Sequence, residues 1–305
     1  MSDEIDRMME QIISDELFGT SPKKGRGMAK KSLDLIEAMA EIAEECNPIT
    51  GRGVGYKLFA AGLIPSMSTS DMKKVYRLLK LAREDGTIPW EYIVDETRSL
   101  EIASTWSDPA EFADCCVRGY RKAYWDQQPI RVEVFSEKGT VRGLLGPVLD
   151  KYGIGFRVMH GFNSAGSVYD VAQSHDDKSL DVLYVGDFDP SGMCMSEVDL
   201  PKRLENYGGD HVTLTRIALL STDISRLQTF PASDKKKDPR YRWFAKHYGD
   251  TCCELDAMDP NRLRDRVEEF IDFNIDDQDA WDRCKVVEAA EKESLQSALL
   301  TWGRQ

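Results

Sequence analysis

The sequence predicts a mixed α/β protein in which a helical N-terminal part precedes a domain with a mainly parallel sheet. Two features support this fold class. Between residues 130 and 219, short apolar segments of strand type alternate with segments of helical periodicity, which is typical of parallel strands joined by crossover helices. Before residue 127 and after residue 240, the spacing of apolar residues is mainly helical. We therefore expect a domain boundary near residue 127.

The composition is that of an acidic globular protein. The chain has 305 residues, 30% of them charged, and a formal net charge of −13, which argues against a generic basic coat protein of nucleic acid. We find no apolar run long enough to span a membrane, and the acidic N-terminus does not have the pattern of a signal peptide. Seven cysteines without a CxxC spacing indicate reduced thiols. These features favour a cytoplasmic protein, associated with the nucleoid if it binds DNA.

The N-terminal part contains three predicted helices, over residues 32–46, 54–61 and 72–84, and then a turn with a short strand over 86–94. Asp71 is in position to cap the third helix. This order is that of a winged-helix module, which places its third helix on DNA. That helix is basic, and we predict that its charged residues bind DNA: Lys73, Lys74, Arg77, Lys80 and Arg83. The alternative is a solvated helix face.

Strands and helices alternate after a hinge at 127–129. We expect strands over 130–135, 156–160, 180–185 and 211–219, with helices over 139–152, 164–174 and 191–207 between them. Further helices are expected over 109–125, 240–248, 260–275 and 279–302.

The segment LDVLYVGDFDPSG, residues 180–192, ends a predicted strand in two carboxylates. Asp187 and Asp189 are two residues apart, so in extended chain both point to one side. They lie at the carboxyl end of a sheet strand, where α/β folds build their sites. Pro190 suits the first position of a helix. The alternative for Asp189 is a capping residue in a tight turn.

A second acid ends the first predicted strand, in VEVFSEKG, residues 132–139. If the first and third strands are neighbours, Glu137 faces Asp187 and Asp189. Three carboxylates suit Mg²⁺, which prefers oxygen ligands and binds phosphate oxygens, and Mn²⁺ is an alternative ion. The other interpretation of Glu137 is a salt bridge to Lys138.

A glutamate after one strand and DxD after a later strand is the signature of the TOPRIM domain. The sequence resembles this domain in FSEKGTVRGLLGPVLDKYGI and in YVGDFDPSG. TOPRIM domains occur in topoisomerases, primases and nucleases. The resemblance implies one or two Mg²⁺ ions bound by Glu137, Asp187 and Asp189 and acting on a phosphodiester, with Lys138 beside Glu137 in the catalytic set.

The upstream segment PITGRGVGYKLFAAGLI, residues 48–64, resembles the catalytic-tyrosine helix of the topoisomerase VI A subunit and of its meiotic double-strand-break relatives. That motif has an arginine four residues before the nucleophilic tyrosine, and the matching residues here are Arg52 and Tyr56. VYRLLKLAREDGTIPWEYIVDETR continues like the short, mini-A members found in bacteria and phages. We expect Tyr76, within this stretch, to be a packing residue.

The resemblance defines a domain organisation. Residues 1–31 form an acidic helix and basic linker, 32–127 a winged-helix (CAP-like) DNA-binding domain, 128–275 a TOPRIM domain, and 276–305 a C-terminal helix. It also implies a reaction, in which Tyr56 attacks DNA and retains its 5′ end while Arg52 stabilises the phenolate or the phosphate. The implied partners are double-stranded DNA, a second copy that supplies the metal site in trans, and a GHKL-type ATPase resembling the B subunit.

The chain departs from the family at two places. Gly51, Gly53 and Gly55 surround the tyrosine motif, and each glycine weakens a helix by about 1 kcal/mol relative to alanine. The A subunit also has an arginine motif after its second TOPRIM strand, where this chain has GFNSAGSVYDVA. Further along, Glu254 and Asp256 are expected to cap the helix that begins near residue 260, with a secondary acidic site as the alternative.

Three alternative functions stay open. A hydrolytic TOPRIM nuclease would use a metal-activated water in place of Tyr56, in a mobile-element or defence role. A non-catalytic DNA-binding subunit would retain the carboxylates as a structural remnant. A small-molecule phosphatase with an aspartyl nucleophile is less consistent with the sequence, because such enzymes carry DxD after the first strand.

Overall fold

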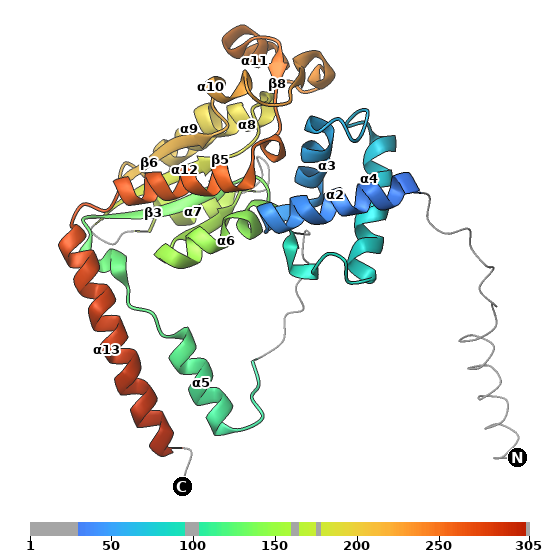
Figure 1. Cartoon of the computed structure of the whole chain (residues 1–305). Helices are drawn as coiled ribbons and strands as arrows, with labels where there is room; N and C mark the ends of the chain where they lie inside the picture. The colour runs from blue at the N-terminus through green and yellow to red at the C-terminus, as the bar shows by residue number, and fades with distance from the viewer. Residues whose placement is uncertain (1–29, 95–103, 160–164, 175–177, 303–305) are drawn as a thin grey trace, which may run out of the picture.

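The computed structural model describes residues 30–94, 104–159, 165–174 and 178–302. It shows a mixed α/β protein with 61% helix and a four-stranded parallel sheet flanked by helices, as the sequence predicts. Figure 1 shows a helical N-terminal unit beside this sheet and an arm of two helices that extends away from it. Within the described ranges, no helix has the length and apolarity needed to cross a membrane. The predicted acidic helix and most of the basic linker lie outside the described residues.

The N-terminal unit consists of three helices and a two-stranded parallel sheet. Their bounds are α2 (Lys30–Cys46), β1 (Ile49–Thr50), α3 (Gly51–Ala60), α4 (Thr69–Glu84), η1 (Trp90–Tyr92) and β2 (Ile93–Val94). Apolar residues at helical spacing, among them Met39, Leu58 and Leu78, fill its core. The predicted cap of α4 is wrong. Ser68 is the N-cap, since its hydroxyl accepts from the amide of Asp71, which lies in the first turn.

Helix α3 begins at Gly51, three residues before its predicted start. The Thr50 hydroxyl caps it by accepting a 2.9 Å hydrogen bond from the Gly53 amide. The glycines allow close packing, because a Cβ on Gly55 would lie 2.6 Å from the Met72 thioether. Tertiary packing and the cap thus outweigh the low helix propensity of the three glycines.

The four-stranded sheet has the order β4–β3–β5–β6, and all neighbouring strands are parallel. The strands are β3 (Ile130–Ser136), β4 (Gly155–Val158), β5 (Ser179–Val185) and β6 (Val212–Ala218). The first and third strands along the chain are therefore neighbours, and Ser136 pairs with Val185 at their carboxyl ends. The residues that follow these two strands meet at one edge of the sheet.

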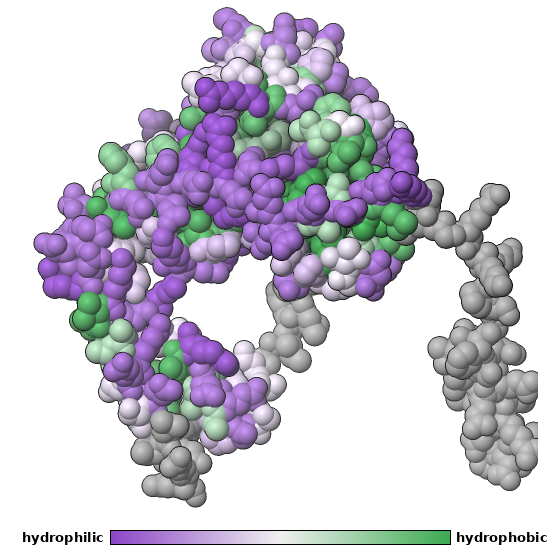
Figure 2. Space-filling model, in the orientation of Figure 1, coloured by the Kyte–Doolittle hydropathy of each residue, from purple (hydrophilic) through white to green (hydrophobic). Residues whose placement is uncertain are grey.

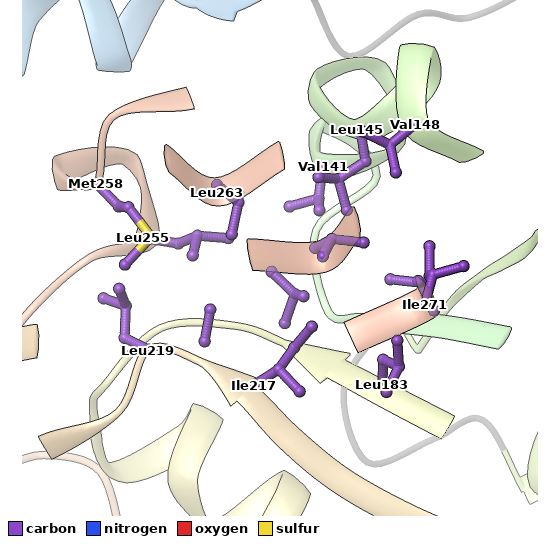
Figure 3. Close-up of a cluster of buried hydrophobic side chains, with 14 of the residues drawn as sticks. Val141, Leu145, Val148, Leu183, Ile217, Leu219, Leu255, Met258, Leu263 and Ile271 are labelled. Carbon is purple, nitrogen blue, oxygen red and sulfur yellow. The ribbon is translucent and has the colours of Figure 1, made fainter. Parts of the chain in front are cut away.

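Helices cover both faces of this sheet. On one face pack α6 (Thr140–Tyr152) and α12 (Pro260–Phe273), and Figure 3 shows how their apolar side chains meet those of β5 and β6. On the other face pack α7 (Ala165–Ala172) and α9 (Leu200–Asn206), around the buried Phe135 and Tyr184. Successive side chains along each strand point alternately into these two cores, which accounts for the nearly continuous apolar sequences of the strands.

The remaining elements follow the predicted order with shorter bounds. Helix α8 (Pro190–Cys194), the π-helical turn η4 (Met195–Asp199) and α9 run on without a break, where the sequence predicts a single helix. The other elements are α10 (Ser221–Ile224), β7 (Phe230–Pro231), η5 (Ala232–Lys235), α11 (Tyr241–Tyr248), β8 (Thr251–Cys252) and η6 (Leu255–Ala257).

The arm consists of α5 (Pro109–Gly119) and α13 (Gln278–Trp302), which pack against each other away from the sheet (Figures 1 and 2). The turn η2 (Tyr124–Gln127) follows α5, where the sequence predicts a continuous helix to residue 125. Tyr124 joins the sheet core, with its ring 4.9 Å from that of Trp281. The segment after residue 104 thus packs with the C-terminal helix and the sheet.

A buried arginine fixes the N-terminal unit to the sheet domain. Arg264 of α12 is 8% exposed, and its guanidinium donates to the carbonyl oxygens of Cys46, Asn47 and Pro48 at 3.1–3.2 Å and of Leu144 at 3.0 Å. The first carbonyl ends α2, so the charge also lies at the negative end of that helix. The Arg264 side chain therefore links α12 to α6 and to the end of α2.

Candidate functional site

The two aspartates of the DxD segment lie in the turn between β5 and α8 and are almost fully buried, at 7% and 5% exposure. Asp189 caps α8, since its carboxylate accepts a 2.8 Å hydrogen bond from the Gly192 amide. Pro190 occupies the first helical position, as predicted. Gly192 permits this tight turn, because a Cβ there would lie 2.3 Å from the Asp187 carbonyl oxygen. The capping interpretation is therefore correct, and the other carboxylate oxygen of Asp189 forms an ion pair with Lys235.

Glu137 follows β3 and lies at the same edge of the sheet. Burial and the charges of Asp187 and Asp189 raise the pKa of Glu137 to about 7. No hydrogen bond or ion pair from the described part of the chain reaches its carboxylate. The strand order thus brings the three predicted carboxylates within electrostatic reach of one another.

Two lysines neutralise the aspartates. The Lys138 ammonium lies 2.8 Å from an Asp187 oxygen and 3.4 Å from Asp256, and the Lys235 ammonium lies 3.2 Å from Asp189. Burial lowers the pKa of Lys138, but the charges of the two aspartates outweigh burial and the pKa is raised. The alternative salt bridge between Glu137 and Lys138 is therefore not formed, because the Lys138 ammonium pairs with Asp187 instead.

Within the described residues, no three His, Cys, Asp or Glu side chains are arranged to hold a metal ion. Lysines and backbone amides engage oxygens of both aspartates. The donor chemistry nevertheless fits Mg²⁺, because the site offers carboxylate oxygens and one acid, Glu137, without a partner among these residues.

Arg216 on β6 is a site residue that the sequence analysis missed. Its side chain is 4% exposed, and it donates to the carbonyl oxygens of Asp187 at 2.9 Å and Gly186 at 3.1 Å and to the Ser196 hydroxyl at 2.9 Å. It thereby fixes the backbone that carries the DxD segment. The available signal was a single arginine in the otherwise apolar second half of a strand.

Residues 254–256 connect the carboxylates at the strand ends to the helix that carries Arg52 and Tyr56. The prediction that Glu254 and Asp256 cap the helix near residue 260 is wrong. Asp259 caps α12 instead, by accepting from the Asn261 amide at 2.9 Å. The Leu255 amide donates to Asp187 at 2.8 Å. Asp256 accepts from the Thr50 hydroxyl at 2.5 Å, at the start of α3. This segment therefore links the strand ends to the tyrosine helix.

Arg52 and Tyr56 of α3 lie next to that segment. Arg52 forms an ion pair with Glu254, and its guanidinium carbon lies 5.7 Å from the centre of the Tyr56 ring. Tyr56 is 7% exposed, and burial and the charge of Glu254 raise its pKa to about 12 against the opposing effect of Arg52. Its phenol is thus protonated at neutral pH. Tyr56, Glu254 and Lys235 line a pocket of about 380 Å³.

The basic helix α4 contributes to a second, larger cleft of about 480 Å³ between the N-terminal unit and the sheet domain. Of its five basic residues, only Lys80 and Arg83 line this cleft, and Lys73, Lys74 and Arg77 are exposed elsewhere on the helix. Arg52 and Lys138 also line it. Tyr76, which we expected to pack, is 44% exposed and faces the cleft.

Comparison with models of known protein families gives no match, and comparison with curated proteins gives none.

Proposed function

We propose that this protein is a Mg²⁺-dependent DNA-cleaving enzyme resembling the topoisomerase VI A subunit, with a winged-helix unit before a TOPRIM domain. One observation carries the proposal. The helix with Arg52 and Tyr56 and the strand ends with the three carboxylates meet within one chain, joined by residues 254–256. A cation, a hydroxyl and acidic oxygens are the groups that phosphodiester cleavage by transesterification needs.

Each group has a defined part in this proposal. Glu137, Asp187 and Asp189 would hold Mg²⁺, which when bound supplies positive charge for the phosphate oxygens. Arg52 leaves Glu254 to contact the phosphate. The Tyr56 oxygen forms a bond to phosphorus and loses its proton, while the bond to the 3′ oxygen breaks and that oxygen takes up a proton. The product is a 5′ end covalently held on Tyr56.

The resemblance implies that the tyrosine of one subunit meets the metal site of another in a homodimer. The ion pair of Arg52 with Glu254 lies within one chain and does not involve the three carboxylates, so the homodimer stays the proposed active unit. Double-stranded DNA is the proposed substrate, and an ATPase subunit resembling the B subunit would be needed for strand passage.

A hydrolytic nuclease is the second candidate, and the environment of Tyr56 favours it. A phenol that is 7% exposed, with a pKa raised to about 12, is a weaker nucleophile at neutral pH than an exposed one. In this candidate the same carboxylates act on a water molecule, and Tyr56 and Arg52 position the phosphate.

Supercoiled DNA distinguishes these candidates. The protein is incubated with DNA and Mg²⁺ or Mn²⁺, stopped with denaturant, and analysed with and without protease. Transesterification predicts nicked or linear DNA that is released only after protease, and Tyr56→Phe abolishes it. Cleavage by Tyr56→Phe that needs no protease establishes the nuclease. No cleavage by the wild-type chain with either metal, despite DNA binding, would contradict both and leave a DNA-binding subunit.

A further inference from the structure

The cleft beside α4 has an unusual charge for this protein. It is lined by four basic side chains, Arg52, Lys80, Arg83 and Lys138, and one carboxylate, Asp256. Three of the basic side chains also have carboxylate partners: Arg52 pairs with Glu254, Lys80 with Glu84, and Lys138 with Asp187 and Asp256. The chain as a whole has a net charge of −13. A phosphate in this cleft would be attracted by the basic side chains in competition with their carboxylate partners, whereas the acidic remainder of the chain would repel it.

One aromatic ring, that of Tyr76, lies among these basic side chains, and a second, that of Trp90, packs against Arg83 outside the lining of the cleft. Tyr76 lines the cleft and is 44% exposed, with its ring against the backbone of α3, since a Cβ on Gly51 would lie 3.0 Å from the ring. Trp90 is 56% exposed, and the Arg83 guanidinium lies 4.3 Å from the centre of its ring. Cations interleaved with exposed aromatic faces are typical of sites that bind unpaired nucleotides, because bases stack on the rings.

The size and position of the cleft restrict the kind of ligand that it can bind. A volume of about 480 Å³ lies within the range of roughly 300–1,000 Å³ that small ligands occupy. A base in a duplex has both faces covered by its neighbours, so only an unstacked base can lie on Tyr76. Lys138 lies both on this cleft and 2.8 Å from Asp187, so a phosphate bound here is next to the carboxylates.

We propose that this cleft binds one unpaired nucleotide of a DNA strand, with its base on Tyr76 and its phosphate between Arg52, Lys80 and Lys138. The inference rests on DNA as the substrate in the proposed function. It adds that the protein selects DNA with a single-stranded segment, such as an overhang or a gap, next to the cleavage site.

Fluorescence anisotropy of the full-length protein tests this proposal, in the presence of chelator so that no cleavage takes place. The probes are a blunt duplex, a duplex of equal length with an overhang, and a single strand. We expect the overhang to bind about tenfold more tightly than the blunt duplex. Tyr76→Ala removes this preference, and Tyr76→Phe, which keeps the ring, retains it. Tyr169→Ala is the matched control, because Tyr169 is 52% exposed but lies on α7.

Several outcomes would overturn the proposal. Equal binding of blunt and overhang probes is one, and an equal loss of affinity for every probe in Tyr76→Ala is another. Competition by a free mononucleotide as effective as that by the single strand would instead assign the cleft to a small molecule. This result can be separated from cleavage. A preference for the overhang without any cleavage would contradict only the proposed enzymatic function. Cleavage without this preference would contradict only the proposed nucleotide binding in the cleft.

Discussion

The two halves of the candidate site are built in different ways. The carboxylates follow adjacent parallel strands, so the sheet itself brings Glu137 and Asp187 to one edge. Tyr56 and Arg52 lie on a helix of the other unit, and their place depends on side chains that join the units, above all Arg264 and Asp256. The acidic half is thus a consequence of topology, whereas the tyrosine half is a consequence of packing between units.

The largest effect is expected from the acidic half. Asp187→Asn removes the charge that faces Lys138 and would bind Mg²⁺, and we expect cleavage to fall about 1,000-fold, equivalent to about 4 kcal/mol. The measurement is the initial rate of nicking of supercoiled DNA. Asp181→Asn is the matched control, because Asp181 lies at the other end of the same strand. Similar rates for the two variants would exclude Asp187 from the reaction.

The second prediction concerns the junction between the halves. Arg264→Ala leaves the carbonyl oxygens at the end of α2 and in α6 without their donor, and we expect the free energy of unfolding to fall by about 3 kcal/mol. Urea denaturation measures this loss. Arg262→Ala is the control on the same helix, where the side chain is 45% exposed. If Arg264→Ala costs no more than Arg262→Ala, the two units are held together by other contacts.

The third prediction concerns metal binding and does not depend on DNA. If Glu137 and the aspartates hold Mg²⁺, an Mg²⁺ concentration about ten times the dissociation constant stabilises the fold by about 1.4 kcal/mol. The unfolding temperature should then rise by a few degrees in MgCl₂ relative to NaCl of equal ionic strength. Glu137→Gln should remove the rise, and Asp181→Asn should retain it. An equal rise in both variants would mean that the ion binds elsewhere.

The sequence predicts the strand order that brings the acidic residues to one edge, but not the contacts of the tyrosine helix, for a physical reason. Strand periodicity fixes which residues follow β3 and β5, and the order of parallel strands places Glu137 and Asp187 together. The partners of Arg52 cannot be predicted in this way, because Glu254 is 202 positions away along the chain and no periodic pattern connects them. Local capping rules gave a wrong prediction for Asp256, because its carboxylate accepts a hydrogen bond from the distant Thr50 hydroxyl instead of capping a helix.

The smallest expected effect tests how tightly the tyrosine helix is held. An added Cβ at Gly53 would lie 2.9 Å from Cγ1 of Ile49, which is fully buried, and 3.2 Å from the capping hydroxyl of Thr50. At Gly55 it would meet only the flexible ends of methionines, chiefly Met72. Gly53→Ala should therefore lower the free energy of unfolding by about 1 kcal/mol more than Gly55→Ala, in which the gain in helix propensity offsets a small shift of Met72.

Urea denaturation of both variants measures this difference in the free energy of unfolding. The cleavage assay shows whether the substitution at Gly53 also changes the activity of the site. Gly53 is next to Arg52, so a shift at this position moves the guanidinium away from Glu254, whereas a shift of Met72 does not. Equal stability of Gly53→Ala and Gly55→Ala would mean that the start of α3 is loosely packed. In that case the link through residues 254–256, and not the helix itself, determines where Tyr56 lies relative to the carboxylates.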